Sequence, residues 1–190
     1  MASIILFHSV YGLRHVEHAA AQRFRAAGHD VFVPDLFAGQ TADTIDRGFE
    51  LMETIGWSRI CVRAERAINE LPADTVLAGI SMGAGVVASL WPHRVDAKGI
   101  LLLHGLAAIP KSARRSLPVQ VHLAEPDGLV SGGQRSAWRR DALRCGLSLQ
   151  MFDYPGAGHF FTDDSLQDHD AEAATKTWAL AVTFLETLSK

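Results

Sequence analysis

The chain has 190 residues, of which 48% are hydrophobic and 21% charged, a composition that suits one compact domain over residues 1–190 with a real core. Its formal net charge of -3 provides no basic footprint for nucleic acid or for an anionic membrane, so neither partner is expected. With only Cys61 and Cys145, and with an apolar start too short for a signal peptide or a membrane span, the chain is expected to be cytoplasmic.

Apolar runs and helical spacings alternate along the chain. The runs predict six strands, at about residues 4–8, 30–33, 75–78, 99–104, 119–123 and 148–154. Helical spacing between and after these strands predicts helices at about residues 15–27, 43–71, 84–90, 134–143 and 174–188. The segment 43–71 is expected to form two helices, with a break near Gly56. Apolar strands that alternate with amphipathic helices predict an α/β fold, with a mostly parallel sheet covered by helices on both faces.

A nucleophile elbow is the most informative motif. Gly79-Ile80-Ser81-Met82-Gly83 follows a predicted buried strand and runs directly into a predicted helix. A strand that reverses sharply into a helix brings the residues two before and two after the serine close together, so side chains at both glycines would collide. The bare pattern also occurs in ordinary glycine-rich turns, but its strand and helix flanks favour the catalytic interpretation.

Three reactive residue types fall at predicted strand ends, in the order Ser81, Asp127, His159. The carboxyl ends of parallel strands are where function collects, and Ser-Asp-His is the chain order of the α/β-hydrolase triad. A serine hydroxyl at neutral pH needs an imidazole to take its proton, and the imidazole needs a carboxylate to hold its tautomer. We therefore predict Ser81 as nucleophile, His159 as general base and acid, and Asp127 as the orienting carboxylate.

Other assignments compete with these. Glu125 and Asp153 are alternative acids, although Asp153 falls inside the last predicted strand, and Asp127 is also a plausible turn former before Gly128. His159 is one of nine histidines and stands out by the two glycines near it and the phenylalanines that follow.

Further site residues are predicted from the same strand ends. The oxyanion of a tetrahedral intermediate needs backbone N–H donors, for which Val10 and Met82 are chosen. The predicted substrate pocket contains Ser9, Tyr11, His104 and Phe160, although a histidine placed like His104 is more commonly a hydrogen-bonded wall residue. No metal site is predicted, since His15 and His18 lack a third ligand nearby, and the chemistry needs no cofactor.

Five short segments in order resemble the dienelactone hydrolase family. They are residues 8–13 (HSVYGL), 34–39 (PDLFAG), 79–83 (GISMG), the loop with Asp127, and 156–161 (GAGHFF). The resemblance spans nearly the whole chain and implies a lid-less α/β-hydrolase fold that hydrolyses small-molecule esters or lactones. Residues 105–118 are independently too few for a capping domain, so an open site is expected.

The chain departs from the family pattern at three positions. The best-known members have Cys where this chain has Ser81, and Glu where it has Ser9, two changes that fit together because a serine nucleophile needs no control of a thiolate. An Arg that typically follows the catalytic His is replaced by the acidic run Thr162-Asp163-Asp164-Ser165. We therefore expect neutral short esters to be better substrates than anionic lactones, unless Arg47, Arg59 or Arg63 from the 43–71 region supplies the anchor.

The resulting hypothesis is a carboxylic ester hydrolase that works through an acyl-enzyme. A thioesterase or acyltransferase would use the same intermediate with another nucleophile. A non-catalytic binding module that retains the fold is the remaining alternative.

Overall fold

The computed structural model describes residues 1–189, which build one six-stranded sheet in the order β2-β1-β3-β4-β5-β6 with every neighbouring pair parallel. The predicted α/β fold with a parallel sheet is therefore confirmed. The strands are β1 (Ser3–Phe7), β2 (Asp30–Phe32), β3 (Val76–Ile80), β4 (Ile100–Leu103), β5 (Pro118–Glu125) and β6 (Ser148–Pro155).

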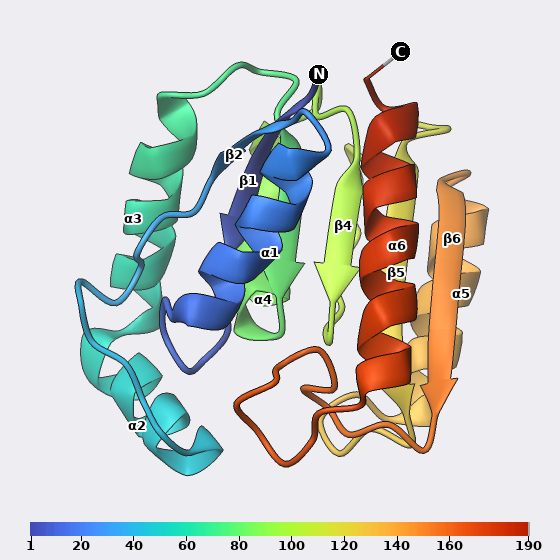
Figure 1. Cartoon of the computed structure of the whole chain (residues 1–190). Helices are drawn as coiled ribbons and strands as arrows, with labels where there is room; N and C mark the ends of the chain where they lie inside the picture. The colour runs from blue at the N-terminus through green and yellow to red at the C-terminus, as the bar shows by residue number, and fades with distance from the viewer. Residues whose placement is uncertain (190) are drawn as a thin grey trace.

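Helices cover both faces of this sheet (Figure 1). α1 and α6 lie on one face, and α3, α4 and α5 lie on the other, with α2 at the edge toward which the strand arrows point. Their bounds are α1 (His15–Ala26), α2 (Ile45–Ile55), α3 (Trp57–Asn69), α4 (Met82–Leu90), α5 (Gly132–Arg144) and α6 (Ala171–Thr187), and a short 3₁₀ turn, η1 (Trp91–His93), follows α4. The predicted break at Gly56 is confirmed, because this residue separates α2 from α3 with a φ of 88°.

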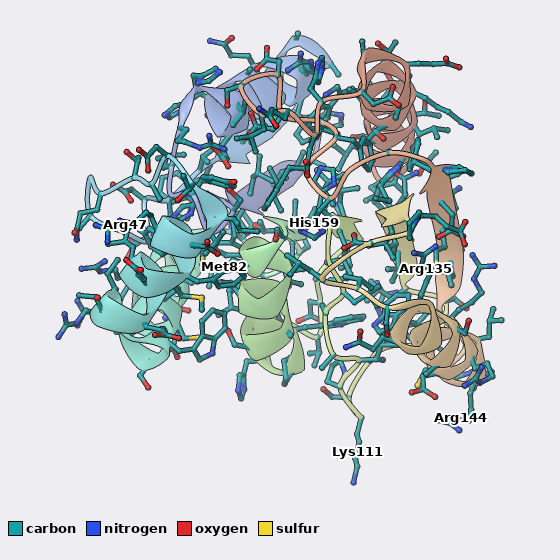
Figure 2. All side chains as sticks on the ribbon, turned by 90° about the horizontal axis from the view of Figure 1, so that it is seen from below. Arg47, Met82, Lys111, Arg135, Arg144 and His159 are labelled. Atoms are coloured by element: carbon teal, nitrogen blue, oxygen red, sulfur yellow. The ribbon has the colours of Figure 1, made fainter. Side chains whose placement is uncertain are left out.

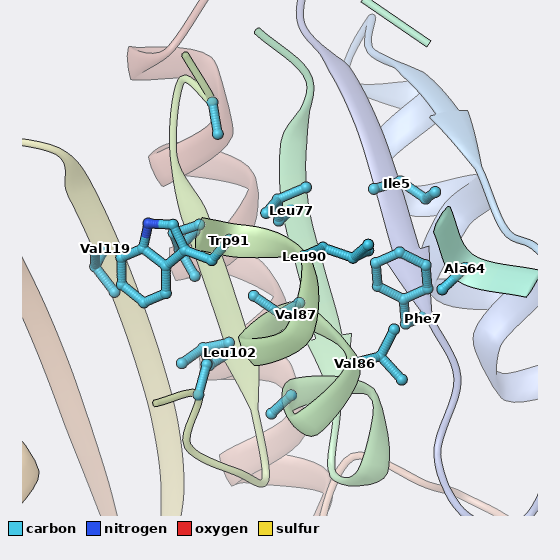
Figure 3. Packing of buried hydrophobic residues seen from close by; sticks show 14 of the residues in the cluster. Ile5, Phe7, Ala64, Leu77, Val86, Val87, Leu90, Trp91, Leu102 and Val119 are labelled. Atoms are coloured by element: carbon cyan, nitrogen blue, oxygen red, sulfur yellow. The ribbon is translucent and has the colours of Figure 1, made fainter. Parts of the chain in front are cut away.

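The core consists of two apolar layers, one on each face. Successive strand side chains point to opposite faces, so Ile4 and Leu6 pack toward α1 and α6, whereas Ile5 and Phe7 pack toward α3 and α4. Figure 3 shows the second layer, in which Phe7 lies against Val86. A strand buried on both faces has no reason to alternate with polar residues, which explains the near-continuous apolar runs in the sequence.

The order of the strands creates a switch point between β1 and β3. The chain leaves β1 toward β2 on one side, returns to pair β3 on the other side of β1, and then adds β4, β5 and β6 outward. In such sheets the crevice at the carboxyl ends beside the switch point is where ligands bind. The loops after β1, β3 and β6 and helix α2 gather at this edge (Figure 1).

Within residues 1–189, no helix combines the length and the apolar composition that crossing a bilayer would require.

Candidate active site

Ser81 occupies a strained turn between β3 and α4. Its φ of 50° and ψ of -107° lie outside the regions that L-residues favour, and its backbone N–H donates to Leu103 O at 2.8 Å. A Cβ on Gly79 would lie 2.3 Å from Gly83 O, and one on Gly83 would lie 2.3 Å from Phe7 O of the neighbouring strand β1. Both glycines are therefore required by close approach, although Gly83 is restricted by β1 and not, as the motif suggested, by Gly79.

His159 reaches Ser81 from the loop after β6. Its Nε2 lies 3.0 Å from Ser81 Oγ, which is hydrogen-bonding distance. Figure 2 views the carboxyl edge of the sheet and places His159 close to Met82, at the start of α4 and near the middle of this face. Residues 78 positions apart in the chain thus meet at the switch point.

Asp127 follows β5 and holds the other ring nitrogen of His159. Both carboxylate oxygens lie 2.8 Å from His159 Nδ1, and the Asp127 side chain is fully covered. One oxygen also accepts the backbone N–H groups of Leu129 at 2.8 Å and Val130 at 3.1 Å. Burial would raise the pKa of this carboxyl, but the hydrogen bond and charge of His159 and the two backbone donors outweigh it, so the pKa is lowered and the carboxylate stays ionised.

The two competing acids point elsewhere. Asp153 lies inside β6, as predicted, and forms ion pairs with Arg135 at 3.1 Å and Arg139 at 3.2 Å. Glu125 pairs with the same Arg135 at 3.3 Å. Arg135, a buried residue of α5, therefore pairs with both alternative acids, and Asp127 is the carboxylate that contacts His159.

The two predicted oxyanion donors come from the loop after β1 and from the start of α4. Met82 is the first residue of α4, and Val10 is buried in the loop after β1, where both side chains share an apolar cluster with Tyr11 and Phe160. Within residues 1–189, neither backbone N–H of this pair donates to a protein acceptor.

A groove of about 670 Å³ opens beside His159. Of the four predicted pocket residues, Tyr11 and Phe160 line it, with their rings edge to face at 5.2 Å. Ser9 and His104 lie behind its wall instead, around a small void of about 10 Å³. The buried His104 ring pairs through Nε2 with Thr162 Oγ1 at 2.6 Å, and burial lowers its pKa well below the usual value, so it is a neutral wall residue.

Glu17 is a buried carboxyl near the site that the sequence reasoning missed. It accepts from Ser9 Oγ at 3.1 Å and from the backbone N–H of Arg14 at 3.0 Å, and burial raises its pKa despite these donors. Its position three residues after the N-cap Arg14 is typical of a capping box, and that spacing was the available signal.

The prediction that Asp163 and Asp164 form an acidic rim around the site is wrong, because neither residue lines the groove. Asp163 is buried and forms an ion pair with Arg14, while Asp164 lines a different hollow and pairs with His15 at 3.4 Å. The acidic residues that do line the groove are Asp43 and Asp168.

None of the three arginines suggested as anchors lines the groove. Arg47, labelled in Figure 2, lies on α2. It lines a neighbouring hollow of about 590 Å³ and pairs with Glu50. Arg63 donates to the Leu36 carbonyl, and Arg59 is exposed on α3.

Comparisons with solved structures show the same fold at low sequence identity. A dienelactone hydrolase-like promiscuous phosphotriesterase, P91, from metagenomic libraries superposes with a TM-score of 0.79 at 17% identity, covering 99% of this chain and 87% of that one. Esterase PE8 gives 0.67 at 18% identity, covering 98% and 92%. MGS-M1, an α/β hydrolase from a Medee basin deep-sea metagenome library, gives 0.68 at 12% identity, covering 100% and 86%.

A search of curated protein sequences found no match. The model of the dienelactone hydrolase family, in contrast, matches residues 1–189. Because that match spans the sheet, its helices and every loop of the candidate site, the chain belongs to the dienelactone hydrolase family of α/β hydrolases.

Proposed function

We propose that this protein is a serine hydrolase of small carboxylic esters. The observation that carries the proposal is the chain of contacts from Ser81 Oγ to His159 Nε2 at 3.0 Å and from His159 Nδ1 to the covered Asp127 carboxylate at 2.8 Å. Nucleophile, base and orienting acid in this geometry are the parts that acyl transfer needs. Membership in a hydrolase family supports the same reaction class.

The first half-reaction forms an acyl-enzyme. Ser81 Oγ attacks the ester carbonyl carbon while its proton passes to His159 Nε2, and the carbonyl oxygen becomes an oxyanion held by the N–H groups of Val10 and Met82. The tetrahedral intermediate then collapses. The bond from carbon to the alcohol oxygen breaks, and His159 returns its proton to the leaving alcohol.

The second half-reaction repeats these steps with water. His159 takes a proton from a water molecule whose oxygen attacks the acyl carbon, and Ser81 leaves with the proton that His159 gives back. Throughout, Asp127 accepts the Nδ1–H of His159, which keeps Nε2 directed at the serine and stabilises the imidazolium when it forms.

The substrate class follows from the openness of the site. Residues 104–117, which connect β4 to β5, contain no helix or strand, so no capping unit rises from this connection over the groove. A groove lined by Tyr11, Ile45, Leu129 and Phe160 suits a short acyl or alcohol chain.

The test is hydrolysis of p-nitrophenyl acetate by the wild type and by Ser81→Ala. Losing the nucleophile should cost several orders of magnitude in kcat, because members of a triad act as a unit. Circular dichroism checks that the variant is folded, and a fluorophosphonate probe should label the wild type alone. Near-normal turnover by folded Ser81→Ala would reject the proposal, and products formed with added alcohol or thiol would distinguish hydrolysis from acyl transfer.

A further inference from the structure

Within residues 1–189, the charged side chains that line the groove beside His159 are, apart from that histidine, acidic. Its walls include the apolar side chains of Ile45, Leu129 and Leu166, and among residues 1–189 its only acidic or basic residues besides His159 are Asp43 and Asp168. No lysine or arginine of this described part of the chain lines it. A charged substrate entering this groove therefore meets carboxylates and no cationic side chain from these residues.

Asp168 lies against the loop that carries His159. Its Oδ2 accepts the backbone N–H of Phe160 at 3.0 Å, and a Cβ on Gly158 would lie only 2.7 Å from its Cγ. The carboxylate thus contacts the residues immediately before and after His159. Its other oxygen has no hydrogen-bond partner within residues 1–189, so it is free to face a ligand in the groove.

Asp43 is the second carboxylate that lines the groove, and it comes from a distant part of the sequence. It lies just before α2, is exposed, and has no ion-pair partner in the described part of the chain. The two carboxylates come from segments 125 residues apart and meet only at this groove.

Two arginines beside the groove already have partners, and one of them, Arg47, pairs with Glu50. Arg14 pairs with Asp163, donates to Ser165 Oγ at 3.2 Å and lies over the Tyr11 ring at 4.4 Å. Burial raises the pKa of Tyr11, Arg14 acts to lower it, and the carboxylates of Asp168, Asp163 and Asp46 each act to raise it. The charged side chains that line the groove itself, within residues 1–189 and apart from His159, are thus the two carboxylates, while Arg14 lies beside it with partners of its own.

We infer that the groove selects esters that carry a positive charge, such as an ammonium or quaternary ammonium group on the alcohol or acyl side. This inference rests on the proposed ester hydrolysis. A cation gains Coulomb attraction from both carboxylates, and its methyl groups pack on the apolar walls. An anionic lactone meets repulsion from the same two side chains.

Charge-matched pairs of esters test the inference. On the alcohol side, the butyrate ester of choline is compared with that of 3,3-dimethylbutanol, which replaces the quaternary nitrogen by carbon. On the acyl side, the phenyl ester of 4-(trimethylammonio)butyric acid is compared with that of 5,5-dimethylhexanoic acid. Shape is conserved in each pair, so the ratio of kcat/KM values isolates the charge. We expect at least one ratio of roughly tenfold in favour of the cation at low salt, falling at high salt.

Asparagine variants assign the effect to the wall. Asp168→Asn keeps an oxygen that can accept from Phe160 N–H but removes the charge, and Asp43→Asn removes the other. Each substitution should lower the ratio of kcat/KM for the cationic ester to kcat/KM for its neutral partner roughly threefold. A loss of activity that affects both esters equally leaves this ratio unchanged. Asp164→Asn is the matched control, since this residue lies in the same segment as Asp168 but outside the groove. It should leave the ratio unchanged.

The outcomes separate the two proposals. If p-nitrophenyl acetate and all four esters are left intact, the proposed ester hydrolysis fails; if p-nitrophenyl acetate is hydrolysed but neither cationic ester is, hydrolysis stands and the inferred charge selectivity is overturned. If the neutral esters are hydrolysed and both ratios are near one, or if Asp164→Asn lowers a ratio as much as Asp168→Asn, hydrolysis stands and the inferred charge selectivity is overturned.

Discussion

At the scale of single residues, three carboxylates near the end of the sheet have different partners. The backbone N–H groups of Leu129 and Val130 and the ring of His159 hold Asp127. Arg135 holds Asp153 and Glu125. The partner, and not the distance along the chain from His159, decides which carboxylate can orient the imidazole.

We predict that Asp127→Asn lowers kcat by orders of magnitude, whereas Asp153→Asn and Glu125→Gln change it by less than about threefold. An asparagine amide would donate to Nδ1 and favour the wrong imidazole tautomer, an effect worth roughly 10⁴ in serine proteases. The two control variants weaken ion pairs of Arg135 and so cost stability instead of turnover. Steady-state kinetics on proteins of verified fold measure the difference, and a severe Asp153→Asn would move the acid to β6.

The candidate triad could be predicted from sequence because each member carries a local signal. Ser81 lies in a Gly-x-Ser-x-Gly turn, and Asp127 and His159 follow apolar runs next to glycines. Arg14 and Asp168 gave no such signal. Arg14 acts on Asp163, 149 residues away, and Asp168 matters because of how its loop folds back on Gly158. These long-range contacts determine which carboxylates line the groove, and sequence patterns do not reveal them. For this reason the acidic rim was predicted at Asp163 and Asp164.

At the scale of elements, the nucleophile turn depends on how closely α4 approaches the sheet. The first turn of α4 lies against the end of β1, so closely that a Cβ on Gly83 would be only 2.3 Å from the carbonyl oxygen of Phe7. The strained backbone of Ser81 is held by this packing and by the hydrogen bond to Leu103 O.

We predict that Gly83→Ala destabilises the protein by about 2 kcal/mol or more and reduces activity, because the new methyl group must push α4 away from backbone atoms that cannot yield. Gly85→Ala in the same helix is the control. Its Cβ would meet only the end of the Trp57 side chain at 3.1 Å, and Trp57 is 42% exposed and can move, while alanine favours the helix by up to about 1 kcal/mol. Urea denaturation compares the two variants. Equal stability of both would show that the close approach to β1 is not a constraint.

The boundaries of elements show what sequence patterns capture. The break at Gly56 was predicted because a glycine interrupts helical spacing, and it has the positive φ that ends α2. The second strand ends at Phe32, a residue before the predicted end, because hydrogen bonding to β1 and not hydrophobicity sets its length. Sequence patterns therefore locate the helices and strands, whereas the end of a strand such as β2 is set by its hydrogen bonds to the neighbouring strand.

At the scale of the whole molecule, the sheet buries three histidines away from solvent. His8 follows β1, His104 follows β4 and His122 lies in β5, and all three are at most 1% exposed. His8 donates through Nδ1 to Ser9 O and accepts the Leu36 N–H on Nε2, an arrangement that only the neutral ring can make. His122 is held between Tyr154 Oη at 2.8 Å and Gln120 Oε1 at 3.0 Å. The fold thus requires uncharged imidazoles in its interior.

Acid should therefore destabilise the protein before its carboxylates are protonated. Burial lowers the pKa of His122 to about 3 and also lowers those of His8 and His104. Between the unfolded value near 6.5 and these folded values the unfolded chain binds more protons, so the free energy of unfolding falls as pH falls. For His122 the window is about pH 6.5 to 3, and the slope approaches 1.36 kcal/mol per pH unit, or about 2 kcal/mol lost by pH 5.

Glu17 opposes this trend, since burial raises its pKa and its folded form gains protons as the pH falls. We therefore predict a difference between variants. His122→Gln, which removes the titrating group, should be less stable than the wild type at pH 7 but should flatten the pH dependence between pH 6 and 4 by up to one proton. The contribution of Glu17 cancels in the comparison because it is present in both proteins. Replacing the exposed His93 by Gln controls for the loss of a histidine as such and should keep the wild-type slope. Urea titrations at half-unit steps from pH 7.5 to 4 give the slopes, and parallel curves for wild type and His122→Gln would exclude His122 as a source of acid lability.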